Sequence, residues 1–373
     1  MLSSVRLRTA LLAVSSFCAL FLLVKLQTTL LILLLSQSLW VIFGLRLSYN
    51  RGRKKPYTAS LILFLPLLIM WLICKTAVTY QNIHLKVLFF IGVSYLLIKS
   101  WTLIKDVYDG RIEPPNALTA IAFFSFFPTY ISGPMHYYKE FEESLQHPNV
   151  PNTHDFVDIA YRFLLGLVKI KVIASLFQPF SLTAVVQAGG ASVSAIILGA
   201  FAYSIVIYAD FSGYSDLAIS TARLFGIYTP ENFNNPYFSS NIREFWQIWH
   251  VSFTRVLTSY IFIPLSRTLQ KKWPRNPQNV MVISYLLTFG FCGYWHGPTS
   301  NFFFWGIYHA TGLILYDLYR AREMKHRLNR GRMPSRKFST TVHKFSGTIC
   351  TFCFVSIGWI WFVMPLPMIL QSR

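Results

Sequence analysis

The sequence predicts an all-α integral membrane protein with about ten transmembrane helices, and its composition and apolar runs carry that prediction. Of its 373 residues, 54% are hydrophobic and 13% are charged, whereas soluble domains carry roughly 25% charged residues. Aromatic residues reach 17%, which suits a bilayer with aromatic belts at both interfaces. A soluble domain could not bury so much apolar surface, so the water-soluble class is excluded.

A transmembrane helix needs about 20 mostly apolar residues. Runs that approach this length lie near residues 9–26, 28–46, 58–79, 84–104, 117–132, 156–178, 191–210, 278–296, 301–319 and 345–370. The first run follows Arg6 and Arg8, as in a signal peptide, but no small-residue cleavage site separates it from the next run. We therefore expect a first transmembrane helix there. The shorter runs allow re-entrant or broken helices as an alternative.

The net charge is +20, from 34 Lys and Arg against 14 Asp and Glu. In a membrane protein, basic residues gather in cytoplasmic loops and set the topology. The strongest basic stretch covers residues 320–337, and we expect it to be cytoplasmic. It could also contact lipid headgroups or dock an acidic protein. We expect no nucleic-acid partner.

The segment between residues 210 and 270 is more polar than the rest. Residues 232–237 form a turn cluster of Asn, Pro and aromatic residues rather than a span. Residues 241–266 interleave charged and aromatic side chains. Such a segment suits a helix that lines an interior cavity or lies along the interface.

Two histidines are candidates for chemistry. His296 ends one apolar run just before another begins, and an ionisable group at membrane depth usually has a partner or a function. Burial alone leaves a structural and a catalytic role equally open. His250 follows Trp246 and Trp249, which we expect to share a helical face with it. It could be a wall residue, a hydrogen-bond donor or an acid/base, whereas His309, inside an apolar run, is expected to be a packing residue.

Other catalytic signatures are missing from the sequence. Cys350 and Cys353 have CxxC spacing without a second ligand pair, so we expect no metal. The sequence has no G-x-S-x-G elbow, phosphate loop or H-E-x-x-H motif. Asp210 and Asp216, at the end of an expected span, could orient a histidine or cap a helix.

An ordered set of blocks resembles the membrane-bound O-acyltransferase superfamily, in its branch of teichoic-acid D-alanyl transfer and alginate O-acetylation. The blocks are SGP (132–134), DFSGYSD (210–216), PENFNNPY (230–237), EFWQIWH (244–250) and YWHG (294–297). The resemblance implies that His296 is the catalytic histidine, that His250 is the second family histidine, and that the helices surround a central funnel or tunnel. The residues expected to support the site or its tunnel are Trp295, Gly297, Trp246, Trp249, Asp210, Tyr214, Asn232, Asn234 and Pro134.

The resemblance also implies a reaction and a division of the chain. A cytoplasmic acyl carrier protein, acidic in character, would supply the acyl group as a phosphopantetheine thioester, and no cofactor would stay bound. Hydroxyls of a cell-envelope glycopolymer, or another acceptor outside the bacterial cytoplasmic membrane, would receive it. We expect one domain over residues 1–373: N-terminal spans (1–80), the catalytic core (90–320), a basic loop (321–344) and a C-terminal span (345–373).

Residues 106–112, 137–143, 308–310 and 316–317 look closer to the D-alanyl branch of this superfamily than to its alginate branch. The resemblance therefore favours D-alanyl as the acyl group, with O-acetylation of an exopolysaccharide or of peptidoglycan as the alternative. A histidine base suits either transfer, because neutral imidazole near pH 7 accelerates such proton abstraction by roughly 10²–10⁴-fold. Two other classes remain open. One is a multi-pass transporter, against which the lack of internal repeats argues. The other is a non-catalytic scaffold that docks an acidic carrier protein.

Overall fold

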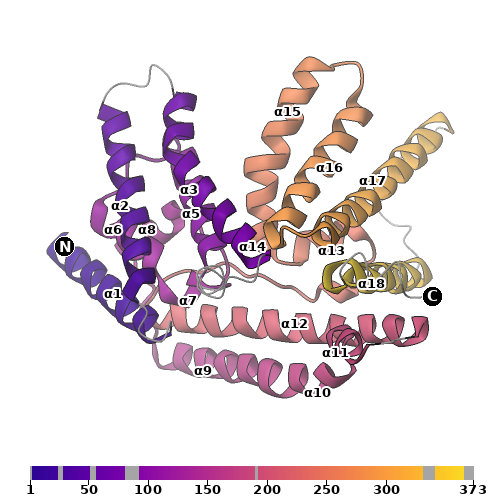
Figure 1. Cartoon of the computed structure of the whole chain (residues 1–373), viewed down its shortest axis with the longest axis horizontal. Coiled ribbons are helices and arrows are strands. Elements are labelled where there is room, and N and C mark those ends of the chain that lie inside the picture. The colour runs from indigo at the N-terminus through magenta and orange to yellow at the C-terminus, as the bar shows by residue number, and fades with distance from the viewer. Residues whose placement is uncertain are drawn as a thin grey trace. The chain divides into compact units, whose positions relative to one another are not determined.

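The computed structural model describes residues 2–23, 28–50, 56–79, 92–189, 192–330 and 341–364. This part of the chain is helical, and its one β-type pairing is an isolated antiparallel bridge between Phe233 and Trp249 (Figure 1). The all-α prediction is therefore confirmed for these residues. The chain forms two compact units: Met1–Leu167 with Tyr214–Glu231, and Val168–Gly213 with Asn232–Arg373. Each unit is described by itself.

The first unit contains α1 (Leu2–Leu23), α2 (Thr28–Asn50), α3 (Pro56–Thr79), α5 (Val93–Tyr108), α6 (Ala117–Ser125), α7 (Phe127–Tyr130), α8 (Tyr138–Gln146), α9 (Thr153–Val168) and the last part of α12 (Val193–Leu224). The run expected to span near 117–132 is broken, because Phe126 leaves the helical conformation and a new helix, α7, begins at Phe127 with Pro128 in its first turn. Proline has no N–H and is tolerated in the first turn of a helix.

Buried polar contacts join the N-terminal helices. Gln37 of α2 donates to the hydroxyl of Ser100 on α5 at 3.1 Å, and the indole of Trp71 on α3 donates to Ser94 on α5 at 2.9 Å. Hydrocarbon offers no competing partner, so such bonds help membrane helices associate. They attach α5 to its two neighbours in the apolar first unit.

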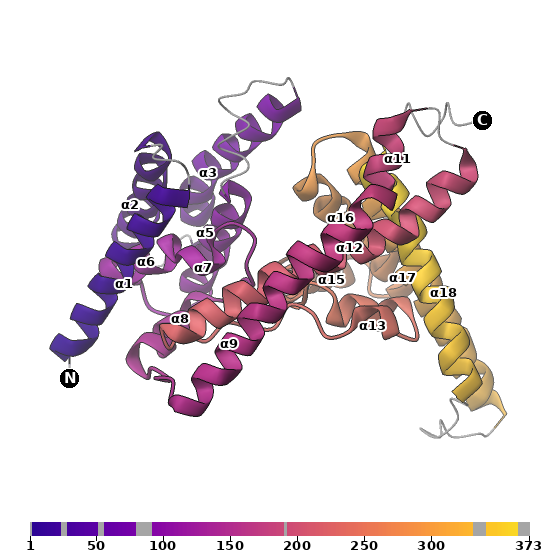
Figure 2. The same cartoon turned by 90° about the horizontal axis from the view of Figure 1, so that it is seen from below.

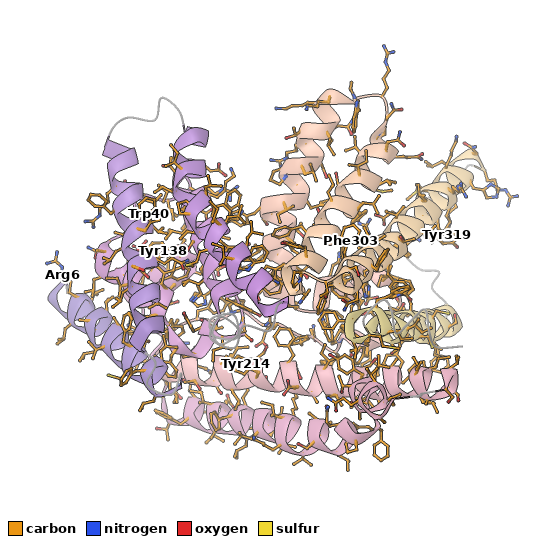
Figure 3. All side chains as sticks on the ribbon, viewed as in Figure 1. Arg6, Trp40, Tyr138, Tyr214, Phe303 and Tyr319 are labelled. Atoms are coloured by element: carbon orange, nitrogen blue, oxygen red, sulfur yellow. The ribbon has the colours of Figure 1, made fainter. Side chains whose placement is uncertain are left out.

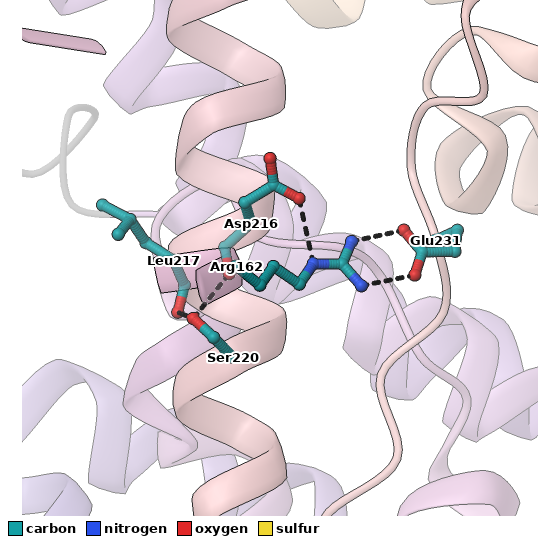
Figure 4. A network of polar contacts seen from close by, with 5 residues as sticks. All are labelled: Arg162, Asp216, Leu217, Ser220 and Glu231. Carbon is teal, nitrogen blue, oxygen red and sulfur yellow. Dashed lines mark hydrogen bonds and ion pairs between the residues drawn. The ribbon is translucent and has the colours of Figure 1, made fainter. Parts of the chain in front are cut away.

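Ion pairs hold α9 to the last part of α12 and to the loop after it (Figure 4). The Nε of Arg162 donates to Asp216 at 2.9 Å, and its Nη1 donates to Glu231 at 2.6 Å. A second pair joins Arg223 to Asp155. Figure 2 shows α9 beside the last part of α12, the arrangement that these pairs stabilise.

The second unit begins with the π-helix η1 (Lys169–Ala174). The elements that follow are α10 (Ser175–Phe177), η2 (Gln178–Phe180), α11 (Leu182–Ala188), the first part of α12, η3 (Pro236–Phe238), α13 (Ile242–Ile248), α14 (Val251–Val256), η4 (Leu257–Phe262), α15 (Ile263–Lys272), α16 (Pro277–His296), α17 (Ser300–Asn329) and α18 (Thr341–Val363). Leu182, Ile196, Ala200 and Met364 form a buried cluster that joins α11 and α12 to the end of α18.

Three helical segments in the described part of the chain are long and apolar enough to cross a bilayer: Ser4–Leu22, Val193–Leu224 and Lys344–Val363. Two shorter apolar stretches are Leu34–Arg46 and Ile62–Ile73. Large apolar side chains point outward, among them Phe303 and Tyr319 of α17, as expected for contact with lipid (Figure 3). The count of ten spans and the funnel remain predictions.

Two expected boundaries differ in the structure, and parts of two expected segments lie outside the described residues. The span expected at 191–210 continues to Leu224 as α12, so Asp210 and Asp216 lie inside this helix and not at its end. The basic loop expected at 321–344 begins as helix, because α17 runs to Asn329. Residues 80–91, which include the start of the expected span at 84–104, lie outside the described residues, as do residues 331–340. The other domain limits stay predictions.

Candidate active site

His296 is the last residue of α16, where a tight turn leads into α17. The turn is made by Gly297, whose N–H bonds the Gly293 carbonyl at 3.1 Å and whose φ of −163° leaves the helical region. A Cβ at Gly297 would come within 2.1 Å of the Phe302 ring. A larger residue at position 297 would have to displace that ring, which accounts for the glycine of the YWHG block.

Aromatic rings surround the half-buried imidazole of His296. The ring centroids of Trp295, Trp305 and Phe362 lie 4.9, 5.2 and 5.3 Å from it, each in an edge-to-face arrangement. Residues from α16, α17 and α18 thus build one wall around a single titratable group. Such a wall limits water around the imidazole, and a dry site strengthens its electrostatic interactions.

His250 lies at a break between two short helices. α13 ends at Ile248, and His250 adopts a left-handed conformation with φ 45° and ψ 50° before α14 begins. The expectation that His250 shares a continuous helical face with Trp246 is therefore wrong. A left-handed non-glycine residue costs about 1–3 kcal/mol, and it persists only where the surroundings impose it.

The turn of residues 232–234 imposes this conformation. Phe233 pairs with Trp249, the Asn234 N–H bonds the Ile248 carbonyl at 3.1 Å, and the Val251 N–H bonds the Asn232 carbonyl at 2.9 Å. Backbone bonds therefore hold the chain on both sides of His250. The predicted turn cluster at 232–237 is confirmed, and its role is to fix the break.

The side chain of Asn232 is fully buried beneath His250. Its Oδ1 lies 3.1 Å from the Nδ1 of His250, 2.6 Å from the Ser252 hydroxyl and 3.3 Å from the Ser252 N–H. The predicted supporting residue Asn232 thus contacts a predicted catalytic residue directly. Ser252, which the sequence did not single out, completes the contact.

Phe253 of α14 contacts both histidines. Its ring centroid lies 5.1 Å from that of His250 and 6.3 Å from that of His296. On its other side, His250 packs edge-to-face on Phe211 of α12 at 4.7 Å. The structure therefore brings the two candidate histidines to one aromatic cluster, although 45 residues separate them in the sequence. The sequence did not single out Phe253, Trp305 and Phe362 as site residues. Phe253 is one of several aromatic residues in the polar segment 241–266, and Trp305 and Phe362 lie in apolar runs, so none of the three carries a distinguishing signal.

The predicted tryptophans are all buried, but they serve different contacts. Trp295 stacks close to Phe253, with centroids 4.4 Å apart. Trp246 packs edge-to-face on His309 at 5.1 Å, and Trp249 stacks on Phe245 at 5.3 Å. Trp295 therefore belongs to the aromatic cluster around the histidines. Trp246 and Trp249 fix α13 against the rest of its unit.

The remaining predicted residues do not contact either histidine in the described contacts. Asp210 has an exposed side chain, and Asn234 contributes its backbone while its side chain is exposed. Tyr214 and Pro134 belong to the first unit, where the Tyr214 hydroxyl bonds the backbone N–H of Ser132. Their place in a shared site stays a prediction.

Comparison with known proteins decides the family. Residues 16–357 match the sequence profile of the membrane-bound O-acyltransferase (MBOAT) family. The chain belongs to the membrane-bound O-acyltransferase family. As its members are, this MBOAT protein is an acyltransferase with membrane-embedded apolar helices.

Relatives of this MBOAT protein modify bacterial envelope polymers. It is 29% identical to the teichoic acid D-alanyltransferase of Bacillus subtilis, over 72% of this chain and 67% of that protein. It is 30% identical to the peptidoglycan O-acetyltransferase of Helicobacter pylori, over 67% of this chain and 46% of that protein. It is 34% identical to a probable alginate O-acetylase of Azotobacter vinelandii, over 60% of this chain and 44% of that protein. The match thus spans under half the length of the two O-acetylating relatives.

Proposed function

We propose that this protein transfers a small acyl group, D-alanyl in the first instance, from a carrier-protein thioester to hydroxyls of a cell-envelope polymer. The observation that carries the proposal is the meeting of His250 and His296 at Phe253, in a chain of the MBOAT family. The family assignment favours an enzyme over the transporter and scaffold alternatives. The location proposed is the bacterial cytoplasmic membrane, crossed several times.

The chemistry needs a base in a dry environment. As an acceptor hydroxyl attacks the thioester carbonyl, His296 takes its proton, a C–O bond forms, and the C–S bond breaks. The departing thiolate then takes that proton from the His296 imidazolium and leaves as the carrier thiol, which returns His296 to its neutral form. The aromatic rings around His296 support this role, because excluded water cannot compete with the acceptor for the thioester.

The partners follow from the charge and the relatives. Exposed basic residues on the last turns of α17 and just after it offer a surface for an acidic acyl carrier protein: Arg320, Arg322, Lys325 and Arg330. Two of the relatives are named for the acylation of teichoic acid and of peptidoglycan, and a third is named a probable alginate O-acetylase. A hydroxyl-rich envelope polymer is therefore the acceptor that we propose.

The test is ester formation in a strain that lacks the protein. Wild type should restore esters on the purified envelope polymer, and His296→Ala should lower their rate of formation by roughly 10²–10⁴-fold. His147→Ala is the matched control, because this exposed histidine follows α8 in the first unit. Full ester content with His296→Ala would exclude His296 as the base.

O-acetylation is the second candidate, favoured by the identity to the Helicobacter and Azotobacter proteins. Mass spectrometry of the released esters separates the two. Alanine released by mild base identifies D-alanyl transfer, and acetate identifies O-acetylation. Finding neither in a strain with a stable, membrane-inserted wild-type protein would contradict both candidates.

A further inference from the structure

The contact between Asn232 and His250 determines which ring nitrogen of His250 carries the proton. The Oδ1 of Asn232 lies within hydrogen-bond distance of three groups: the Nδ1 of His250, the hydroxyl of Ser252 and the backbone N–H of Ser252. Because Asn232 is fully buried, water does not compete for this oxygen. The three groups around this oxygen must therefore act as its hydrogen-bond donors.

The backbone fixes the orientation of the amide. A backbone N–H can only donate, so the Asn232 atom that faces the Ser252 N–H must be the oxygen and not the NH₂ group. An amide oxygen carries no hydrogen. The Nδ1 of His250, which shares this oxygen at 3.1 Å, must therefore carry the proton.

The other ring nitrogen is then the acceptor. A neutral imidazole with its proton on Nδ1 has its lone pair on Nε2. In the described part of the structure, the Nε2 of His250 is buried and makes no hydrogen bond. A buried acceptor without a donor is costly, so this nitrogen is suited to a donor group that arrives with the substrate.

We propose that Asn232 is a positioning residue that holds His250 as the Nδ1–H tautomer and so presents its Nε2 to a second hydroxyl of the acyl acceptor, not the one that His296 deprotonates. This inference rests on the proposed function for the identity of the substrate, but the tautomer itself does not. The left-handed backbone at His250 serves the same end. The bonds from residues 232–234 that impose it also place the imidazole on the Asn232 oxygen.

Ring-nitrogen NMR of the full chain tests the tautomer without any substrate. The protein is labelled with ¹⁵N-histidine and solubilised in detergent, and His250→Gln identifies the signals that belong to His250. Wild type should show a protonated Nδ1 and an unprotonated Nε2. Asn232→Leu should move the proton to Nε2 or mix the two forms, while ester formation falls at least about tenfold. Phe238→Leu, an exposed position in the same turn, should leave the tautomer as in wild type.

Asn232→Asp guards against misfolding, because it keeps the acceptor oxygen in place. It should retain the Nδ1–H form and shift the acidic limb of the rate–pH profile to higher pH, since a carboxylate stabilises the imidazolium. Wild type and Asn232→Asp share the other titratable or charged groups on the elements packed near His250. These are His296 on α16, Arg255 on α14 and Asp210 on α12. His296 is the one that interacts electrostatically with His250 in the described contacts.

Two results would overturn the inference. One is an Nε2–H tautomer in the wild type. The other is an unchanged tautomer in a folded Asn232→Leu protein. Either result leaves the proposed function untouched, because that function is judged by the esters lost with His296→Ala. A correct tautomer in a protein that forms no esters would, in turn, sink the function and keep the inference.

Discussion

Gly293 of α16 lies so close to Phe302 of α17 that a Cβ on the glycine would come within 2.2 Å of the Phe302 carbonyl oxygen. The same approach recurs one turn away, where a Cβ on Gly306 would meet the Phe289 carbonyl at 2.1 Å. Paired small residues let two membrane helices approach closely. This approach sets the turn that carries His296.

Gly293→Ala should therefore separate α16 from α17. We expect a loss of about 1–3 kcal/mol in stability, because an added methyl group in a packed interface forces the backbone to shift. Ester formation should fall with it, as His296 follows the displaced segment. Thermal unfolding in detergent measures the first effect. Gly290→Ala is the control, since its Cβ would meet only the Phe303 ring, at 3.3 Å, and an equal loss there would contradict this account.

Asp317→Asn should loosen α13 from α16 and α17. The Asp317 carboxylate is largely buried and accepts from the Nε of Arg243 at 3.0 Å and from the Tyr285 hydroxyl at 2.9 Å. Hydrogen bonds to a charged group contribute about 1.5–3 kcal/mol, and solvent around the half-exposed Arg243 places the loss near the lower value. The midpoint of thermal unfolding measures it.

Arg243→Lys extends that test, because a lysine cannot reproduce the forked contact of a guanidinium. We expect a partial loss of stability, between wild type and Asp317→Asn. A lysine variant as stable as wild type would show that the charge alone matters. A variant less stable than Asp317→Asn would point to a role for Arg243 beyond this ion pair.

Arg162→Gln should destabilise the first unit, because it removes bonds to both Asp216 and Glu231 (Figure 4). We expect about 1–3 kcal/mol, given that two carboxylates lose a charged partner. Lys139→Gln is the control, since its pair with Glu143 is 3.9 Å long and exposed on both sides. Exposed pairs of this kind contribute about 0–1 kcal/mol. Equal effects of the two substitutions would contradict the assigned role of Arg162.

The stability added by Asp155 should depend on pH. The N–H of Asn152, and then the nearby Arg223, hold the pKa of this carboxyl below its usual value. A lowered pKa in the folded state means that the stabilisation is present above the unfolded pKa of about 3.9. It is lost as the pH falls through the lower folded value.

Asp155→Asn should therefore melt below wild type at neutral pH, and the two melting curves should converge at strongly acidic pH. Paired melts across that range measure the difference. A gap that stays constant down to acid pH would mean that the charge of Asp155 contributes nothing. The predicted convergence would instead assign the difference to its ionisation.

Much of the candidate site could be predicted from local sequence. The sequence predicts the turn at residues 232–237, because Asn and Pro favour turns. It also singles out His296 as an ionisable residue between apolar runs. The left-handed backbone conformation of His250 could not be predicted from the sequence. The composition of residues 241–250 fits one continuous helix. The bridge between Phe233 and Trp249 interrupts that helix, however, so α13 ends at Ile248.

The sequence by itself determined the membrane environment, the helical class, the family and the two histidines, since composition, apolar run length and ordered motifs are properties of the chain alone. The tertiary structure alone decided that Asn232 lies under His250, that Phe253 contacts both histidines, and that Asp210 points to the surface. These relationships depend on bonds between segments far apart in the chain. No local periodicity records which of those segments meet.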